Sequence, residues 1–327
     1  MLSALIFALS RSRIAEQIAT HAPGVRGFSR RFVAGRDQTD ALAAVQRLND
    51  AGFETTVSFL GEAVTSEHAV RAAIDEFTSF VAAAHARRLR SGISVKLTQL
   101  GLAFDRTLAE RSLDDVLNCA SAAGVFVRID MEDSRYTAAT LDIFRAARAR
   151  HDNIGIVIQA YLRRSAADID ALAREGARVR LVKGAYREPP SIAFPSKREV
   201  DQSYARLIDA YFAAMPQSAS PDSPSHPLVM VPDSSNPDPH PAAVASPVRR
   251  LAIATHDPRM QRAALRSVRA REVQEEMFEF QMLYGIRTDL QRALHDQGHR
   301  VRVYIPYGSH WCPYLMRRLA ERPANLW

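Results

Sequence analysis

The chain has 327 residues, of which 47% are hydrophobic and 24% charged, and this composition excludes wholesale disorder and collagen-like repeats. Only two cysteines are present, Cys119 and Cys312, which excludes a disulfide scaffold and a cysteine-rich metal site. The net charge of +7 is compatible with an anionic partner, but the basic residues are scattered among acidic ones and form no long block.

Residues 1–52 predict helices and contain no strand-like run. The opening stretch MLSALIFALS is mostly apolar, but it is too short to span a bilayer and lacks the leading positive charge of a signal peptide. We therefore expect an amphipathic N-terminal helical segment and a cytoplasmic protein.

From residue 53 onward, short β-branched or apolar runs alternate with stretches of helical periodicity. The predicted strands are 55–60, 93–97, 125–130, 154–158, 179–183, 251–254, 273–280 and 301–305. The predicted helices are 67–90, 107–123, 137–150, 165–175, 197–214, 258–270 and 287–297, with a last one from Trp311. Eight strand–helix units predict an α/β fold, a (β/α)8 TIM-like barrel over residues 53–327. The competing architecture is an open doubly wound sheet, although no GxGxxG or GxxxxGK[ST] loop is present to mark a nucleotide site.

One segment interrupts this alternation. Residues 216–248 contain nine prolines and seven serines and no glycine. Such a composition cannot bury enough apolar surface to offset the entropy of ordering it, so we expect a flexible insertion before the sixth strand.

Polar residues stand where the predicted strands end, which is where (β/α)8 barrels carry their chemistry. They include Lys96, Arg128, Asp130, Gln159, Arg180, Lys183, Thr255, His256 and Tyr304. Arg128 and Asp130 share a parity and should point to one side of the sheet. A lysine such as Lys96 at a barrel mouth can bind an anion, form a Schiff base or be solvated.

The last predicted helix carries Tyr314, Arg317, Arg318 and Glu321 within two turns. The spacing places the tyrosine and both arginines on one face, with the glutamate able to orient a guanidinium. Two neighbouring guanidinium groups suit a carboxylate held between them, while a solvated face with an Arg–Glu pair is the alternative. Together with Lys96, they suggest a pocket for a small carboxylate with an apolar tail.

The strings SVKLTQLG, VRIDMEDS, VIQAYLRR, RLVKGAYREP, ATHD, FEFQMLYG, VYIPYG and YLMRRLAER resemble those of proline dehydrogenases, in order, from about residue 55 to the end. These are FAD-containing (β/α)8 barrel enzymes that oxidise L-proline to Δ1-pyrroline-5-carboxylate, the first step of proline catabolism. The chain resembles the short, monofunctional bacterial type.

The resemblance implies a role for each matching residue. Lys96, Arg317 and Arg318 would hold the proline carboxylate, while Asp130 would orient the cationic and tyrosine groups. Tyr186, Leu283, Tyr304 and Tyr314 would wall the ring. The residues at FAD-contacting positions are Gln159, Arg180, Lys183, Thr255 and His256, and Glu321 matches the glutamate that pairs with the helix arginines. No metal is implied.

The resemblance also implies a hydride transfer from proline C5 to flavin N5, with the electrons passed on to a quinone. A peripheral contact with the inner membrane and a partnership with a pyrroline-5-carboxylate dehydrogenase are further expectations, and nucleic acid is not an expected partner. Two alternatives come from other classes: a lyase or aldolase with a Schiff base on Lys96 or Lys183, and a nucleic-acid-binding protein suggested by the basic charge alone.

Overall fold

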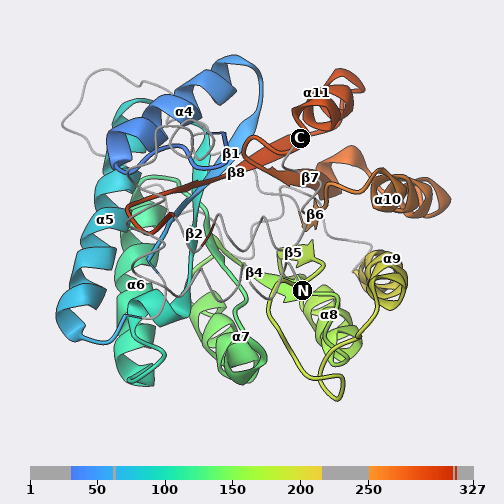
Figure 1. Ribbon diagram of the computed structural model, residues 1–327, viewed down its shortest axis with the longest axis horizontal. Coiled ribbons are helices and arrows are strands. Elements are labelled where there is room, and N and C mark those ends of the chain that lie inside the picture. The colour runs from blue at the N-terminus through green and yellow to red at the C-terminus, as the bar shows by residue number, and fades with distance from the viewer. Residues whose placement is uncertain (1–30, 62–63, 216–249, 312–313, 315–327) are drawn as a thin grey trace, which may run out of the picture.

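The computed structural model describes residues 31–61, 64–215, 250–311 and 314, and these form a closed barrel of parallel strands surrounded by helices (Figure 1). The strands are hydrogen-bonded in sequence order and β1 closes on β8. They are β1 (Glu54–Phe59), β2 (Ser91–Val95), β3 (Val127–Ile129), β4 (Ile154–Gln159), β5 (Val179–Val182), β6 (Leu251–Ala254), β7 (Phe278–Leu283) and β8 (Val301–Tyr307). The predicted (β/α)8 barrel is confirmed.

The helices form where the sequence has helical periodicity. They are α4 (Gln38–Asp50), α5 (Glu67–Ala86), α6 (Arg106–Ala122), α7 (Ser134–Arg148), α8 (Ser165–Arg174), α9 (Lys197–Ala214), α10 (Pro258–Ala270) and α11 (Thr288–Asp296). Short 3₁₀ turns, η1 (Leu97–Leu100) and η2 (Glu275–Met277), follow β2 and precede β7. Aspartate or serine caps six of the helices by accepting a hydrogen bond from a backbone N–H of the first turn.

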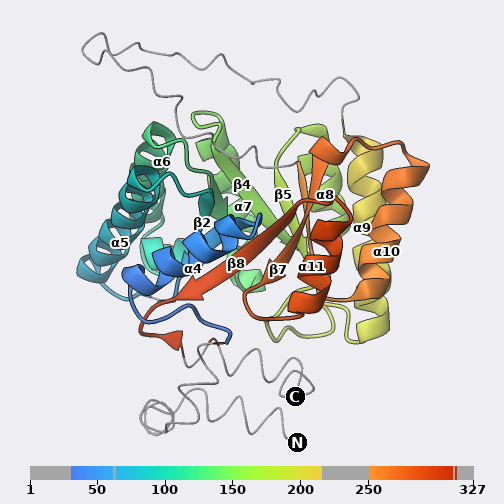
Figure 2. The same ribbon diagram turned by 90° about the horizontal axis from the view of Figure 1, so that it is seen from above.

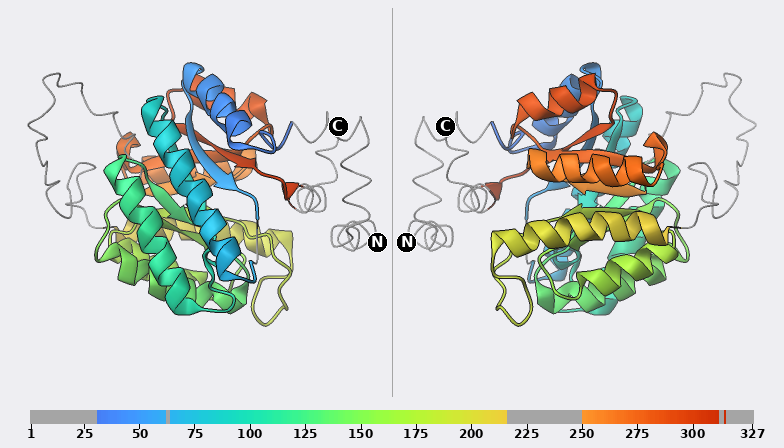
Figure 3. Two further views of the ribbon diagram at one scale, coloured as in Figure 1. Left: turned by 90° about the vertical axis from the view of Figure 1, so that its left-hand side faces the viewer. Right: turned by 90° about the vertical axis from the view of Figure 1, so that its right-hand side faces the viewer.

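Helices cover the outside of the barrel. Figure 3 shows α5, α6 and α7 side by side on one flank, and α9 beside α10 on the other. Figure 2 shows α4 lying along β8, and α4 also contacts β1. The helix α4 thus packs on the seam where the barrel closes, while the division of the chain at residues 52 and 53 stays a prediction.

One predicted strand was placed wrongly. The expected strand 273–280 is β7, Phe278–Leu283, and part of the expected run is η2. The inward positions of β7 are the polar Glu279 and Gln281, so apolar residues do not mark where the strand runs. The other predicted strands match within a few residues at each end.

The interior of the barrel is unusually polar, while the side chains that face the helices are apolar. Arg128, Arg180, Glu279 and Arg302 are each at most 4% exposed. A glycine makes room for one of them, since a Cβ on Gly155 would lie 2.5 Å from Nη1 of Arg128. The strands therefore enclose a charged interior, which continues to their carboxyl ends.

Several predicted features fall outside the described residues: the opening apolar helix, the insertion 216–248, and most of the last helix. Within the described ranges, no helix is long and apolar enough to cross a membrane. The same ranges contain no group of histidine, cysteine and acidic side chains arranged to hold a metal ion.

Candidate active site

A single carboxylate, that of Asp130, gathers polar side chains from several strands at the carboxyl end of the barrel. Its Oδ2 lies 3.2 Å from Nζ of Lys96 and accepts a hydrogen bond of 2.9 Å from the hydroxyl of Tyr304. Its Oδ1 accepts from Ser94 at 2.7 Å and from Nη1 of Arg180 at 3.0 Å. The strands β2, β3, β5 and β8 therefore meet at one acid, which we call the mouth cluster: Ser94, Lys96, Asp130, Arg180 and Tyr304.

The electrostatics of the mouth cluster keep Asp130 ionised. Burial raises the pKa of this carboxyl, but the charges of Lys96 and Arg180 and two hydrogen bonds outweigh it, so its pKa lies below the ordinary value. Burial, followed by the charge of Asp130, raises the pKa of Tyr304, which keeps its hydroxyl protonated as a donor. The result is a fixed charge pattern at neutral pH.

A chain of hydrogen bonds inside the barrel orients the side chain of Arg180. Its Nε donates to Oε1 of Gln281 at 2.5 Å, and Nε2 of Gln281 donates to Glu279 at 2.5 Å. Glu279 also forms a buried ion pair with Arg302 at 2.8 Å. Burial raises the pKa of Glu279, but the charge and hydrogen bonds of Arg302 outweigh it and lower the pKa. An ionised carboxylate only accepts, so Gln281 must turn its NH₂ to Glu279 and its oxygen to Arg180.

One nitrogen of the Arg180 guanidinium, Nη2, is buried and has no hydrogen-bond partner among the described residues. The guanidinium carbon also lies 5.2 Å from the ring centroid of Tyr304, within the range of a cation–π contact. A buried donor without an acceptor is costly, so this nitrogen is suited to an acceptor atom of a ligand.

Lys183 belongs to a second group of charges, which includes Asp201 and Asp257. Its Nζ contacts Asp201 of α9 at 2.5 Å and Asp257 at 3.3 Å. Hydrogen bonds from Arg259 and the charge of Lys183 hold the pKa of Asp257 well below its usual range. Asp257 also donates its backbone N–H to the hydroxyl of Thr255. Asp257 therefore contacts both Lys183 and Thr255.

His256 and Leu283 are held together at the ends of β6 and β7. Nε2 of His256 accepts a 2.8 Å hydrogen bond from the backbone N–H of Leu283, which assigns the ring proton of a neutral imidazole to Nδ1. The side chain of Leu283 packs against an apolar cluster that includes Trp311 and Tyr314. Two of the four residues expected to wall the ring, Leu283 and Tyr314, thus belong to one apolar surface.

The structure brings together some predicted site residues and separates others. Lys96, Asp130, Arg180 and Tyr304 meet directly. Gln159 is 2% exposed and donates to the backbone oxygen of Glu132 at 2.8 Å. Tyr186 packs against a different apolar cluster, around Tyr161 and Leu162. Arg317, Arg318 and Glu321 lie outside the described residues.

Sequence reasoning missed Ser94, which belongs to the mouth cluster, and the two residues that orient Arg180 from inside the barrel, Glu279 and Gln281. Ser94 stands two residues before Lys96, and Gln281 two before Leu283. Their shared parity with the predicted residues was the available signal, because alternate residues of a strand face the same side.

Comparisons with known proteins show which family the chain resembles. The family model described as "Proline dehydrogenase" matches residues 41–326. The chain is 36% identical to Proline dehydrogenase 1 of Bacillus subtilis over 99% of this chain and 96% of that protein. It is 34% identical to the proline dehydrogenase of Deinococcus radiodurans over 91% of this chain and 87% of that protein.

A solved structure shares the fold. Proline utilization A from Bdellovibrio bacteriovorus, inactivated by N-propargylglycine, superposes with a TM-score of 0.76 at 25% identity. The match covers 92% of this chain but only 33% of that one, so the chain spans about a third of the length of this larger protein.

Proposed function

The chain belongs to the proline dehydrogenase family, and on that premise we propose that it oxidises L-proline to Δ1-pyrroline-5-carboxylate, with FAD as cofactor and a quinone as electron acceptor. This oxidation is the first step of proline catabolism. The observation that carries the proposal is the mouth cluster, where a lysine, an arginine and a tyrosine meet one ionised acid.

The mouth cluster would hold the substrate by its carboxylate. Lys96 is 9% exposed in its side chain and is anchored to Asp130, so its ammonium group is already positioned before the substrate arrives. Arg317 and Arg318 would complete the clamp, as the family resemblance implies. The tyrosine hydroxyl is fixed by the same acid, so Tyr304 would present its ring to the apolar part of the substrate.

The apolar cluster around Leu283 and Tyr314 would wall the ring of the substrate, with Tyr186 on another side. Excluding water from a secondary amine disfavours its charged form. A neutral amine can release electrons to an acceptor, whereas an ammonium cannot. The protein's own contribution is therefore to orient the substrate and to desolvate it.

The residues present fit a flavin. The spare Nη2 of Arg180 is a buried donor in need of an acceptor, and a flavin ring carries carbonyl and nitrogen acceptors at its edge. Gln159, Lys183, Thr255 and His256 would make the remaining contacts, and Glu321 would pair with the helix arginines. FAD, when bound, supplies the two-electron acceptor for the oxidation.

The electrons would leave through a membrane quinone, so we expect a cytoplasmic protein that attaches loosely to the inner membrane. Its product would pass to a pyrroline-5-carboxylate dehydrogenase. Fractionation of cells at low salt measures the attachment. Activity found entirely in the soluble fraction would contradict it.

The absorption spectrum of the purified protein tests the cofactor and the substrate together. We expect flavin bands that bleach on anaerobic addition of L-proline and persist with D-proline as the control. A colourless protein that takes up no FAD would contradict the proposal. Trapping of a substrate on Lys96 or Lys183 by borohydride would instead support the aldolase alternative.

Replacing the clamp residues tests how the substrate is held. Arg318→Met should raise KM for proline by roughly a hundredfold, because a charge-assisted bidentate contact is worth about 3 kcal/mol. Lys96→Met should raise KM in the same direction. Arg174→Gln, on the exposed side of α8, is the control and should leave KM unchanged.

A further inference from the structure

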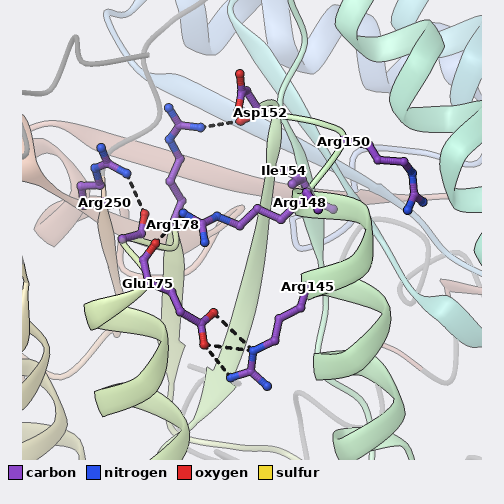
Figure 4. A pocket seen from close by; sticks show the side chains of 10 residues that line it. Arg145, Arg148, Arg150, Asp152, Ile154, Glu175, Arg178 and Arg250 are labelled. Carbon is purple, nitrogen blue, oxygen red and sulfur yellow. Dashed lines mark hydrogen bonds and ion pairs between the residues drawn. The ribbon is translucent and has the colours of Figure 1, made fainter. Parts of the chain in front are cut away.

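A hollow of about 430 Å³ lies at the amino ends of the strands, whereas the mouth cluster lies at their carboxyl ends. Figure 4 shows the side chains that line the hollow. It is formed where α7 leads into β4, where α8 leads into β5, and where β6 begins. Its lining residues are Arg145, Arg148, Ala149, Arg150, Asp152, Ile154, Glu175, Gly176, Arg178 and Arg250. Five of these ten are arginines, so the hollow carries a concentrated positive charge.

Three of the arginines have no acidic partner within the described part of the chain, and we call them the amino-end arginines: Arg148, Arg178 and Arg250. Each donates to a backbone carbonyl instead, of Glu175, Asp152 and Gly176 respectively, at 2.5 to 2.6 Å. The acids that line the hollow offset these charges only in part. Glu175 is paired with Arg145 at 2.9 Å, as Figure 4 shows, and the residue Asp152 is exposed.

The amino-end arginines repel one another. Burial, then the charge of Arg250, lowers the pKa of Arg178, and Arg148 adds to the effect. Burial also lowers the pKa of Arg148; the charge of Glu175 opposes this shift and the charge of Arg250 adds to it. Partly buried cations that face each other across a hollow are stabilised when an anion lies between them.

The geometry suits a phosphate group. A Cβ placed on Gly176 would lie 3.8 Å from Nη1 of Arg250 and 3.9 Å from Nη2 of Arg148. These nitrogens are therefore no more than about 8 Å apart, a span that one phosphate bridges with two hydrogen bonds of about 2.8 Å. Arg178 adds a third charge to the lining, beneath which the ring of Phe126 lies at 5.8 Å.

Capping of α8 explains only part of this arrangement. Arg148 and Arg250 donate to carbonyls just after Arg174, the last residue of that helix, and cations are favourable there. Each guanidinium carries five N–H donors and spends one on the capped carbonyl, so most of its donors remain for a ligand.

We propose that the hollow lined by Arg148, Arg178 and Arg250 binds a small polyanion that carries phosphate groups. The hollow has the volume of a small-ligand site and is partly enclosed, which favours a small soluble molecule over a lipid surface. β4 runs from Ile154 at the hollow to Gln159 at the mouth, so the two sites are about 16 Å apart along the strand. The ligand is therefore not a reactant and does not depend on the proposed oxidation.

Calorimetric titration of the FAD-loaded protein with inorganic pyrophosphate at low salt tests this proposal, because the bound cofactor occupies the other phosphate-binding site. We expect a Kd of about 10–100 µM, in line with two or three charge-assisted contacts. Arg148→Gln with Arg250→Gln should weaken binding at least about tenfold. The matched control, Arg174→Gln, removes an arginine of α8 that pairs with Asp170 outside the hollow, and should bind as the wild type does.

A second variant controls for loss of folding. Arg250→Lys keeps the positive charge, so its Kd for pyrophosphate should stay within about fivefold of the wild-type value. The proposal can therefore be tested even if the double variant fails to fold. ATP should bind with an affinity similar to that of pyrophosphate. The proposal is overturned if the wild type binds neither probe, if the double variant folds and binds as well as the wild type, or if only vesicles of phosphatidylglycerol bind.

Discussion

The two ends of the barrel both collect cationic side chains, but they balance the charge differently. At the mouth, Lys96 and Arg180 share the buried carboxylate of Asp130. At the amino end, the guanidinium groups of Arg148 and Arg250 form hydrogen bonds only to backbone carbonyls among the described residues. An internal acid holds the mouth cations in place before any ligand binds, whereas the amino-end cations remain available to an external anion.

The difference follows from what each region must do. A site that orients a substrate needs side chains whose rotamers are already fixed, and a buried acid with several donors provides this. Removing one partner of such a group leaves uncompensated charge in a low-dielectric interior. The amino-end arginines are more exposed to water, so their charge is screened and each of them can be replaced at lower cost.

The largest effect is expected from removing the acid at the mouth. Asp130→Ala leaves Lys96 and Arg180 without their shared partner, so it should lower the free energy of unfolding by about 3–5 kcal/mol and reduce kcat/KM for proline at least a hundredfold. Asp152→Ala, at the amino end, is the control and should change stability by less than about 0.5 kcal/mol. If both variants changed stability and kcat/KM equally, the two ends of the barrel would not differ in how they balance charge. Denaturant unfolding and steady-state kinetics measure both.

A smaller effect is expected from the hydrogen bonds that orient Arg180 inside the barrel. Gln281→Leu removes the amide between Arg180 and Glu279, so it should destabilise the protein by about 1–3 kcal/mol and weaken FAD binding several-fold. FAD release on dilution, followed by fluorescence, provides a readout that does not depend on turnover. Gln291→Leu serves as the control, since that amide donates to the backbone of β7 and the following loop outside this chain of bonds. Unchanged FAD affinity in Gln281→Leu would show that Arg180 holds its orientation without help.

The pH dependence of stability tests whether Asp130, at the mouth, is ionised. The pKa of Asp130 is lower in the folded protein than its ordinary value of 3.8, so its contribution to stability is present above that pH and is lost as the pH falls through the folded pKa. The stability difference between wild type and Asp130→Asn should therefore be constant near neutral pH and shrink below about pH 4. Unfolding in denaturant from pH 3 to 7 measures it. A difference that is independent of pH across this range would contradict an ionised Asp130.

The smallest effect concerns the repulsion at the amino end. Added salt screens exposed charges, so raising NaCl from about 0.02 to 0.3 M should stabilise the wild type slightly, by less than about 1 kcal/mol. Arg148→Gln with Arg250→Gln should respond less to salt, because the repelling pair is gone. Chloride is a poor substitute for a phosphate, so pyrophosphate should stabilise the wild type more than an equal ionic strength of NaCl does. Identical salt responses in the two proteins would show that the arginines do not repel measurably.

Much of the fold could be predicted from local patterns. The alternation of short β-branched runs with helical stretches predicted the barrel, and strand ends pointed to Lys96, Asp130, Arg180 and Tyr304. The prediction for β7 was wrong because its inward residues are Glu279 and Gln281, which break the apolar run. A polar interior removes the signal on which strand prediction depends.

The sequence by itself determined the order of the elements, the residues at the carboxyl ends of the strands, and the family to which the chain belongs. Only the tertiary structure decided which charges meet: Lys183 pairs with Asp201 and Asp257, while Arg148 and Arg250 approach one another from different elements. The reason is physical. Periodicity and capping act over a few neighbouring residues, whereas charge pairing depends on the register with which eight strands close into a barrel and on how much water is excluded there.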